Sequence, residues 1–412
     1  MTEQAGSERQ AMRVPVLDGF RGVAILGVVV VHMLVLSGAL DTPGSALNVA
    51  VFGLFGNVID AFFIISGFVL FLPVVLRNGH FGSLKTFAVG RAARLLPAYW
   101  LSLAVALGLI ALAPLSPVTG FPGFGSVALH LGALQTPARL VVDLPQGFGL
   151  NGPVWMISLM VGFYAVLPLV ARPYYRHPLA GLALAALITV GWKEAVTIFG
   201  GELGALNGQA PAIARLIAVD QLPGWTFSFA LGMTGAWAYV RLVRSGRNRE
   251  RIARRAPAVL ALGAIVYLGF AYLYGRSAAT VNPIVAGSFA RESSLVSIGS
   301  SASRAVLMAA VVVGPLWLRR PFQSRPARRL GGISYGLYLG HVMIGLYAGL
   351  LLGLPTDGSV AAVVLWLAIV VPASLLYGEA SARLVERPAA RLARRVERRP
   401  DRAPSGPAVA SP

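Results

Sequence analysis

Long apolar segments dominate this chain, and short polar stretches separate them. Ten segments are long enough, or nearly so, to cross about 30 Å of hydrocarbon, which requires roughly 20 helical residues. They cover residues 17–38, 49–76, 95–115, 152–171, 178–199, 223–240, 257–275, 303–318, 333–353 and 360–383. Interior residues such as Pro168 and Gly232 do not exclude helices here, because membrane helices tolerate both residue types. The pattern predicts an all-α, polytopic membrane bundle of about ten transmembrane helices.

Basic residues decide the predicted orientation of this bundle. If the N-terminus is cytoplasmic, the inner segments hold 29 of the 35 Lys and Arg residues. The other six are left for the outer side: Arg139, Lys193, Arg215, Arg276, Arg291 and Arg304. Because cytoplasmic loops carry the excess of Lys and Arg, both termini are predicted to be cytoplasmic.

The domain organisation follows from the same pattern. We expect residues 1–16 to form a cytoplasmic N-terminal tail and residues 17–388 to form one ten-span membrane domain. Residues 389–412 are predicted to be a basic, disordered cytoplasmic tail, because their composition cannot bury an apolar face. The long outer segments are poor in charge and rich in turn-forming residues, which predicts either solvated loops or irregular, re-entrant structure there: 116–151, 200–222 and 276–302.

Composition agrees with a membrane location and excludes several classes of protein. The chain is 56% hydrophobic and 12% charged, with a mean hydropathy of +0.70, whereas soluble domains carry roughly 25% charged residues. The net charge of +19 is spread between apolar segments rather than gathered on one polar face, so no nucleic-acid partner is expected. The absence of cysteine excludes disulfides and a thiolate nucleophile, and the five scattered histidines show no metal-ligand spacing.

The first apolar segment, LDGFRGVAILGVVVVH, places ionisable groups at membrane depth. Such groups are costly there and usually mark a functional path. Arg21 and His32 are eleven residues apart, so they share one face of the predicted helix, with an axial separation of about 16 Å. Asp18 lies one i,i+3 step from Arg21 and is close enough to pair with it. A second interpretation stays open, in which Arg21 anchors the helix and His32 is a hydrogen-bonded structural residue.

A second group of polar residues follows along the chain. Asp60 and Ser66 lie within an otherwise apolar segment, and the cytoplasmic loop after it holds Arg91 and Arg94, at the start of a predicted helix. Two arginines at i,i+3 spacing project together and can grip a phosphate-bearing ligand bidentately. Positive-inside anchoring also explains many such pairs, so both interpretations of the arginines remain.

Together these segments resemble the acyltransferase-3 family of integral-membrane O-acyltransferases. The matching stretches, in chain order, are LDGFRGVAILGVVVVH, DAFFIISGF, RAARLLP, NGPVWMISLMVGFYAVLPL, GGISYGLYLGH and LVERP. One such stretch is a weak signal, whereas six in order along a predicted ten-span chain are specific. The resemblance covers most of the chain.

The resemblance implies an activity and roles for particular residues. We expect transfer of an acyl group, acetyl in the first instance, from acyl-CoA to a hydroxyl of a carbohydrate or glycosylated acceptor. By position, His32 is the catalytic residue, Arg21 and Asp18 support it, and Arg91 with Arg94 contacts the donor phosphates. The expected setting is the inner (plasma) membrane, with acyl-CoA as a co-substrate and no permanently bound cofactor or metal. Four further residues are expected to contact the substrates: Asp60, Ser66, Trp155 and His341.

The expected chemistry is plausible for these residue types. A neutral imidazole can take a hydroxyl proton near pH 7, and the activated hydroxyl then attacks the thioester carbonyl while a nearby donor stabilises the oxyanion. An acyl-histidine intermediate is an alternative route. Asp18 and Asp60 are candidates for orienting the imidazole of His32. His341 is interpreted as a buried tautomer held by a neighbour such as Tyr335 or Tyr338, with structural and substrate-contact roles both open.

One position departs from the family pattern. Family members commonly carry a glutamate a few residues after the tryptophan of the fourth stretch, and Met160 stands there in this chain. Another group then supplies the acid, or the acceptor is unusual, or activity is lost. Two other functions stay open: a non-catalytic family member and a transporter of small molecules or lipids. A transporter predicts internal pseudo-symmetry with broken helices, and the sequence shows none.

Overall fold

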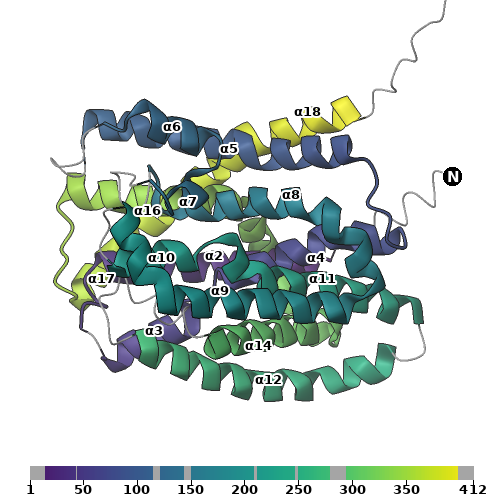
Figure 1. Ribbon diagram of the computed structural model, residues 1–412. Coiled ribbons are helices and arrows are strands. Elements are labelled where there is room, and N and C mark those ends of the chain that lie inside the picture. The colour runs from purple at the N-terminus through teal and green to yellow at the C-terminus, as the bar shows by residue number, and fades with distance from the viewer. Residues whose placement is uncertain are drawn as a thin grey trace, which may run out of the picture.

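The computed structural model describes residues 14–42, 44–114, 121–142, 150–207, 211–245, 249–278 and 294–397. Over these ranges the chain forms helices joined by turns and short connections, and none of the described residues belongs to a strand. The long helices run side by side across Figure 1, which is the arrangement of a membrane helix bundle. The predicted all-α fold is therefore confirmed.

Nine helical stretches in the described part of the chain are long and apolar enough to cross a membrane: Pro15–Leu36, Ala46–Leu76, Leu84–Leu112, Gly152–Arg176, Pro178–Glu202, Glu250–Ser277, Ser294–Val313, Arg325–Leu352 and Val360–Arg395. The helices that build them are α2 (Pro15–Leu36), α3 (Ala46–Phe55), α4 (Asp60–Leu76), α5 (Leu84–Leu112), α8 (Trp155–Arg176), α9 (Pro178–Asn207), α12 (Arg249–Ala278), α14 (Ser294–Val313), α16 (Arg325–Leu352), α17 (Val360–Ser381) and α18 (Arg387–Glu397). A short 3₁₀ turn, η1 (Gly152–Val154), precedes α8. The protein is thus a multi-pass membrane protein.

The one predicted segment without a counterpart among these nine stretches, residues 223–240, forms the 24-residue helix α11 (Leu222–Ser245). At 1.5 Å per residue it is about as long as the other spans. It is not among the nine stretches above because Ser, Thr, Gly and Trp lower its hydropathy. These residues suit its position inside the bundle, where it packs closely along α4. A side chain on Gly232 would collide with the backbone oxygen of Ile64, so only glycine permits this approach.

Several predicted boundaries were wrong. The predicted outer segment 276–302 contains the first part of α14, which begins at Ser294. The error arose because α14 begins with a polar stretch that the bundle buries, including Ser297, Ser300 and Ser301. Arg304, counted above on the outer side, lies within this helix with only 7% of its surface exposed.

The predicted outer segments also contain short helices rather than irregular chain. They are α6 (Phe124–Leu131), α7 (Gln135–Ala138) and α10 (Pro211–Val219). The stretch 115–120 and the stretch 143–149 lie outside the described residues, as does most of the third predicted outer segment.

The C-terminal region continues as helix beyond the predicted domain end at residue 388. After α17, one π-helical turn, η2 (Ala382–Glu386), leads into α18, which lies along α5 (Figure 1). The predicted disordered tail is therefore helical from 389 to 397, because small and apolar residues recur along one face of α18. Residues 398–412, like the predicted N-terminal tail up to residue 13, lie outside the described residues.

Helices α2 and α16 form one of the closest pairs in the bundle and carry much of the site described below. Near one end, a side chain on Gly331 of α16 would collide with the backbone oxygen of Asp18 in α2. Near the other end, a Cβ atom on Gly345 would lie 2.8 Å from Cδ1 of Leu36. These contacts at both ends hold the two helices close together and fix their register.

Candidate functional site

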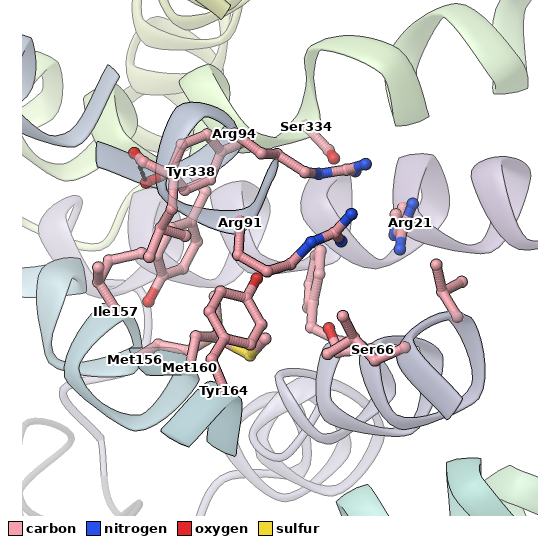
Figure 2. A pocket seen from close by; sticks show the side chains of 15 residues that line it. Arg21, Ser66, Arg91, Arg94, Met156, Ile157, Met160, Tyr164, Ser334 and Tyr338 are labelled. Atoms are coloured by element: carbon pink, nitrogen blue, oxygen red, sulfur yellow. Dashed lines mark hydrogen bonds between the residues drawn. The ribbon is translucent and has the colours of Figure 1, made fainter. Parts of the chain in front are cut away.

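Five helices enclose a pocket of about 770 Å³, counting the part that opens to solvent. The walls come from α2, α4, α5, α8 and α16, and the view in Figure 2 looks into the space between them. Its lining residues are Arg21, Phe62, Ser66, Val69, Leu70, Arg91, Arg94, Leu95, Met156, Ile157, Met160, Tyr164, Ser334, Tyr335 and Tyr338. The pocket therefore gathers four of the residues predicted to act at the site, namely Arg21, Ser66, Arg91 and Arg94.

Three arginines give the pocket its charge. In Figure 2 the side chains of Arg91 and Arg94 extend from α5 toward Arg21 on α2. Nη1 of Arg21 lies 3.5 Å from Oδ1 of Asp18, which confirms the predicted i,i+3 pair. None of the 15 lining residues is a carboxylate. The three guanidinium groups face a shared space, so the pocket favours an anionic ligand with several oxygens.

An apolar and aromatic wall faces the arginines. In Figure 2 this wall comes from one helix, α8, through Met156, Ile157, Met160 and Tyr164. On α16, Tyr335 donates a hydrogen bond from its hydroxyl to the backbone oxygen of Leu95, 2.8 Å away. This bond ties α16 to α5. The pocket thus suits a ligand that is anionic at one side and largely uncharged along the other.

Two histidines meet beside this pocket. The ring of His32 in α2 and the ring of His341 in α16 pack edge to face, with centroids 4.9 Å apart. Neither ring is among the lining residues, and Tyr338 connects them with the pocket. Tyr338 lines the pocket, and its ring centroid lies 5.9 Å from that of His341.

Backbone carbonyls fix the orientation of both imidazoles. Nδ1 of His32 lies 2.8 Å from the backbone oxygen of Val28, and Nδ1 of His341 lies 2.7 Å from that of Tyr338. A carbonyl can only accept a hydrogen bond, so each Nδ1 carries a proton. When the rings are neutral, the basic lone pair of each is then on Nε2. A neighbour such as Tyr335 or Tyr338 was predicted to hold a buried His341 tautomer; the neighbour is Tyr338, and the contact is made by its backbone oxygen.

Besides His341, two more of the predicted substrate-binding residues do not line the pocket. Asp60 is fully buried and pairs with Arg304 of α14, with Oδ2 and Nη1 2.8 Å apart. The ring of Trp155 packs against that of Trp225, with centroids 5.7 Å apart, and does not line the pocket. Asp60 therefore does not orient His32, because its interaction is with α14.

The sequence of the chain matches the model of an acyltransferase domain over residues 14–378, which is nearly the whole helical bundle. The chain belongs to the acyltransferase-3 family. No curated protein and no solved structure is detectably similar to it. Family membership together with the apolar helices makes the protein a membrane acyltransferase.

The position at which this chain departs from the acyltransferase-3 pattern lies in the wall of the pocket. Met160 lines the pocket, so the acid that family members commonly carry there would face the arginines. The other lining residues do not supply a carboxylate in its place. The pocket of this family member is therefore more basic and more apolar than the family pattern predicts.

Several site residues were not predicted from the sequence. Tyr164 and Phe62 line the pocket, as does Leu95, and nothing in their local sequence distinguishes them from helix-packing residues. Tyr335 and Tyr338 lie in the stretch GISYGLYLGH, and their i,i+3 spacing was the available signal that both face one side of α16.

Proposed function

We propose that this protein is an integral-membrane O-acyltransferase that uses acyl-CoA and acylates a hydroxyl of a carbohydrate or glycosylated acceptor. Acetyl is the acyl group expected first, and the setting is the bacterial inner (plasma) membrane with both termini cytoplasmic. One observation carries the proposal: a pocket with three arginines adjoins, through Tyr338, a pair of histidines whose basic nitrogens are Nε2. The arrangement combines a site for phosphates with a proton acceptor.

The spacing of charge and base favours a donor such as acyl-CoA. Arg21 and His32 are separated by eleven residues of one helix, which is an axial distance of about 16 Å. A ligand held by its phosphates at Arg21, Arg91 and Arg94 must therefore carry its reactive carbonyl on a long arm. Coenzyme A thioesters have this construction, whereas an acyl phosphate holds its carbonyl directly beside the phosphate.

His32 is the residue suited to start the reaction. Its Nε2 takes the proton of the acceptor hydroxyl as the oxygen attacks the thioester carbonyl. The new carbon–oxygen bond forms, the carbon–sulfur bond breaks, and the thiolate leaves with the proton that His32 accepted. The hydrogen bond from Nδ1 to Val28 keeps the ring in the tautomer that this step requires.

The decisive experiment measures release of coenzyme A. Membrane vesicles containing the protein are supplied with acetyl-CoA and a carbohydrate acceptor extract, and free thiol is followed over time. His32→Ala should lower the rate by about 10²- to 10⁴-fold, the usual contribution of a general base. His177→Ala is the matched control, because His177 is exposed at the end of α8. Undiminished turnover in His32→Ala would show that His32 is not the general base.

Donor binding is tested separately from the proton transfer. Arg91→Ala should raise the KM for acetyl-CoA by about 10- to 100-fold, which corresponds to one lost charge-assisted hydrogen bond. Arg172→Ala removes an exposed arginine of α8 that does not line the pocket, and it should leave this KM unchanged. Equal effects of the two substitutions would assign Arg91 to membrane anchoring.

The alternatives make different predictions in the same assay. A transporter or a non-catalytic family member would release no coenzyme A above the level of vesicles that lack the protein. Such a protein would still bind an anionic ligand at the three arginines, so binding without turnover would favour these alternatives.

A further inference from the structure

One end of the arginine pocket carries no charge. In Figure 2, Met156, Ile157 and Tyr338 lie at the end opposite Arg21. Phe62 belongs to the same end, because its ring centroid lies 6.5 Å from that of Tyr338. We call these four residues, Phe62, Met156, Ile157 and Tyr338, the apolar end of the pocket.

The packing of α2 on α16 fixes how far the apolar end lies from the arginines. A Cβ atom on Gly22, the neighbour of Arg21 in α2, would lie 3.0 Å from the backbone nitrogen of Gly331 in α16. Tyr338 follows Gly331 by seven residues, which is about 10 Å along the helix axis. A ligand that is bound by its phosphates at the arginines therefore meets the apolar end with its far part.

The apolar end offers a ligand few hydrogen bonds. Met156, Ile157 and Phe62 have thioether or hydrocarbon side chains, and the hydroxyl of Tyr338 already donates to the backbone oxygen of Pro153. Carbohydrate hydroxyls would lose their hydrogen bonds to water here and gain few in return, which is unfavourable. A hydrocarbon chain has no such loss and gains from leaving water. The apolar end therefore suits a hydrocarbon group better than a sugar.

The apolar end also adjoins the histidine pair. The ring of Tyr338 lies 5.9 Å from that of His341, which packs against the ring of His32. In the proposed reaction the thioester carbonyl meets His32, and the acyl chain continues from that carbonyl. The acyl chain, rather than the pantetheine arm, is therefore the part of the donor that contacts the apolar end.

Met160 extends this surface toward the arginines. It lines the pocket one helical turn from Met156, about 6 Å along α8, and it stands where family members commonly carry an acid. An alkyl chain packed against a carboxylate at this position would remove water from the charge, which costs free energy. The unbranched thioether of methionine instead adapts to the shape of an apolar ligand. The departure from the family pattern thus favours a larger apolar group in the pocket.

We propose that the donor carries an uncharged acyl chain of about four to six carbons, which is about as long as the turn of α8 between Met156 and Met160. Met160 then helps to determine the specificity for the acyl group. This inference rests on the proposed acyl transfer and changes only the length of the group that is moved. The acceptor oxygen still forms its bond to the carbonyl carbon, the carbon–sulfur bond breaks, and the hydroxyl proton leaves with the thiol.

The first test compares donors that differ only in the acyl group. Membrane vesicles containing the protein receive the carbohydrate acceptor extract with acetyl-CoA, butyryl-CoA or succinyl-CoA, and kcat/KM is obtained from the release of coenzyme A. Each CH₂ group that leaves water strengthens binding about fourfold, so kcat/KM should be about 15-fold higher for butyryl-CoA than for acetyl-CoA. Succinyl-CoA has the chain length of butyryl-CoA and a terminal carboxylate, so it should be the poorer of these two. Equal values for acetyl-CoA and butyryl-CoA, or a preference for succinyl-CoA, would overturn the proposal.

Two substitutions test which residues set the preference. Met160→Glu restores the acid and should lower the ratio of the butyryl-CoA and acetyl-CoA values about fourfold or more, the contribution of at least one buried CH₂ group. Both donors share the same coenzyme A, so any effect of the new charge on the arginines cancels in this ratio. Met156→Trp fills the apolar end and should shift the preference to acetyl-CoA.

The matched control is Leu169→Trp, at a position of α8 that is 78% exposed and does not line the pocket. It should leave the ratio unchanged. If Met160→Glu and Met156→Trp also leave the ratio unchanged, the acyl chain does not lie at the apolar end.

A binding measurement separates this inference from the proposed function, because it needs no turnover. The purified protein in detergent micelles is titrated calorimetrically with butyryl-CoA and with acetyl-CoA in the absence of acceptor, and butyryl-CoA should bind about 15-fold more tightly. This preference without release of coenzyme A in the vesicle assay would keep the acyl site and refute acyl transfer. Turnover with equal affinities for the two donors would refute the acyl site alone, and binding of neither donor would refute both.

Discussion

The buried ion pair between Asp60 and Arg304 joins α4 to α14 and should be a main determinant of stability. Oδ2 and Nη1 are 2.8 Å apart, with the Asp60 side chain fully buried and that of Arg304 9% exposed. Nη2 of Arg304 also donates to the hydroxyl of Tyr267, 3.2 Å away. Removing one partner leaves the other charge buried without compensation, which costs about 3–5 kcal/mol. We therefore expect Arg304→Met to lower the free energy of unfolding by about this amount.

The double variant Asp60→Asn/Arg304→Met should recover most of that loss, because desolvation offsets much of the attraction between two buried charges. Unfolding is followed by tryptophan fluorescence during titration with sodium dodecyl sulfate from mixed micelles. Arg276→Met, at an exposed position of α12, serves as the control and should change stability by less than about 0.5 kcal/mol. A loss below about 1 kcal/mol in Arg304→Met, or a double variant as unstable as the single one, would refute this reasoning. Acyl transfer by the double variant would also show that Asp60 has no substrate role.

Three further predictions concern the site and its surroundings. Gly331→Ala should lower stability by about 1–3 kcal/mol and reduce turnover, since its methyl group would collide with the backbone of α2, whereas Gly332→Ala, which meets open space, should be neutral in both assays. Tyr335→Phe should cost about 0.5–1.5 kcal/mol in the same unfolding titration, because it removes the hydrogen bond between α16 and α5. Burial lowers the pKa of His130, whose Nε2 accepts a hydrogen bond from the backbone N–H of Leu150, so the unfolded chain binds a proton more readily. Stability should therefore decrease as the pH falls below about 6.5, and unfolding titrations of His130→Gln should show a weaker pH dependence; equal slopes would contradict this.

The sequence predicted the class of fold well, because long apolar segments have one solution in a bilayer. Each of the ten predicted segments corresponds to a helical stretch long enough to span, although residues 49–76 form two helices, α3 and α4, and α11 is less apolar than the others. The start of α14 was missed because a hydropathy pattern counts Ser297 and Arg304 as polar regardless of their partners. Arg304 is buried because Asp60 and Tyr267 satisfy it, and that pairing depends on residues far away in the sequence.

The site was predictable to the extent that its residues share a helix. Arg21 with Asp18, and Arg91 with Arg94, follow from i,i+3 spacing, and the pocket contains Arg21 and both α5 arginines. The histidine pair could not be predicted in this way, because it depends on the register between α2 and α16. That register is set by glycine contacts, and a single sequence does not show which glycines face which helix.

The same two helices connect the arginine pocket with the histidine pair. Helix α2 carries Arg21 and His32, and helix α16 carries Tyr335 in the pocket wall and His341 beside it. A helix transmits an axial displacement along its whole length, so a shift of α16 against α2 would disturb phosphate binding and proton transfer together. The collision expected in Gly331→Ala would displace α16 against α2 in this way. Gly331 lies about 15 Å along the helix axis from His341. If Gly331→Ala loses turnover although every pocket residue is kept, the cause is therefore the altered register between α2 and α16.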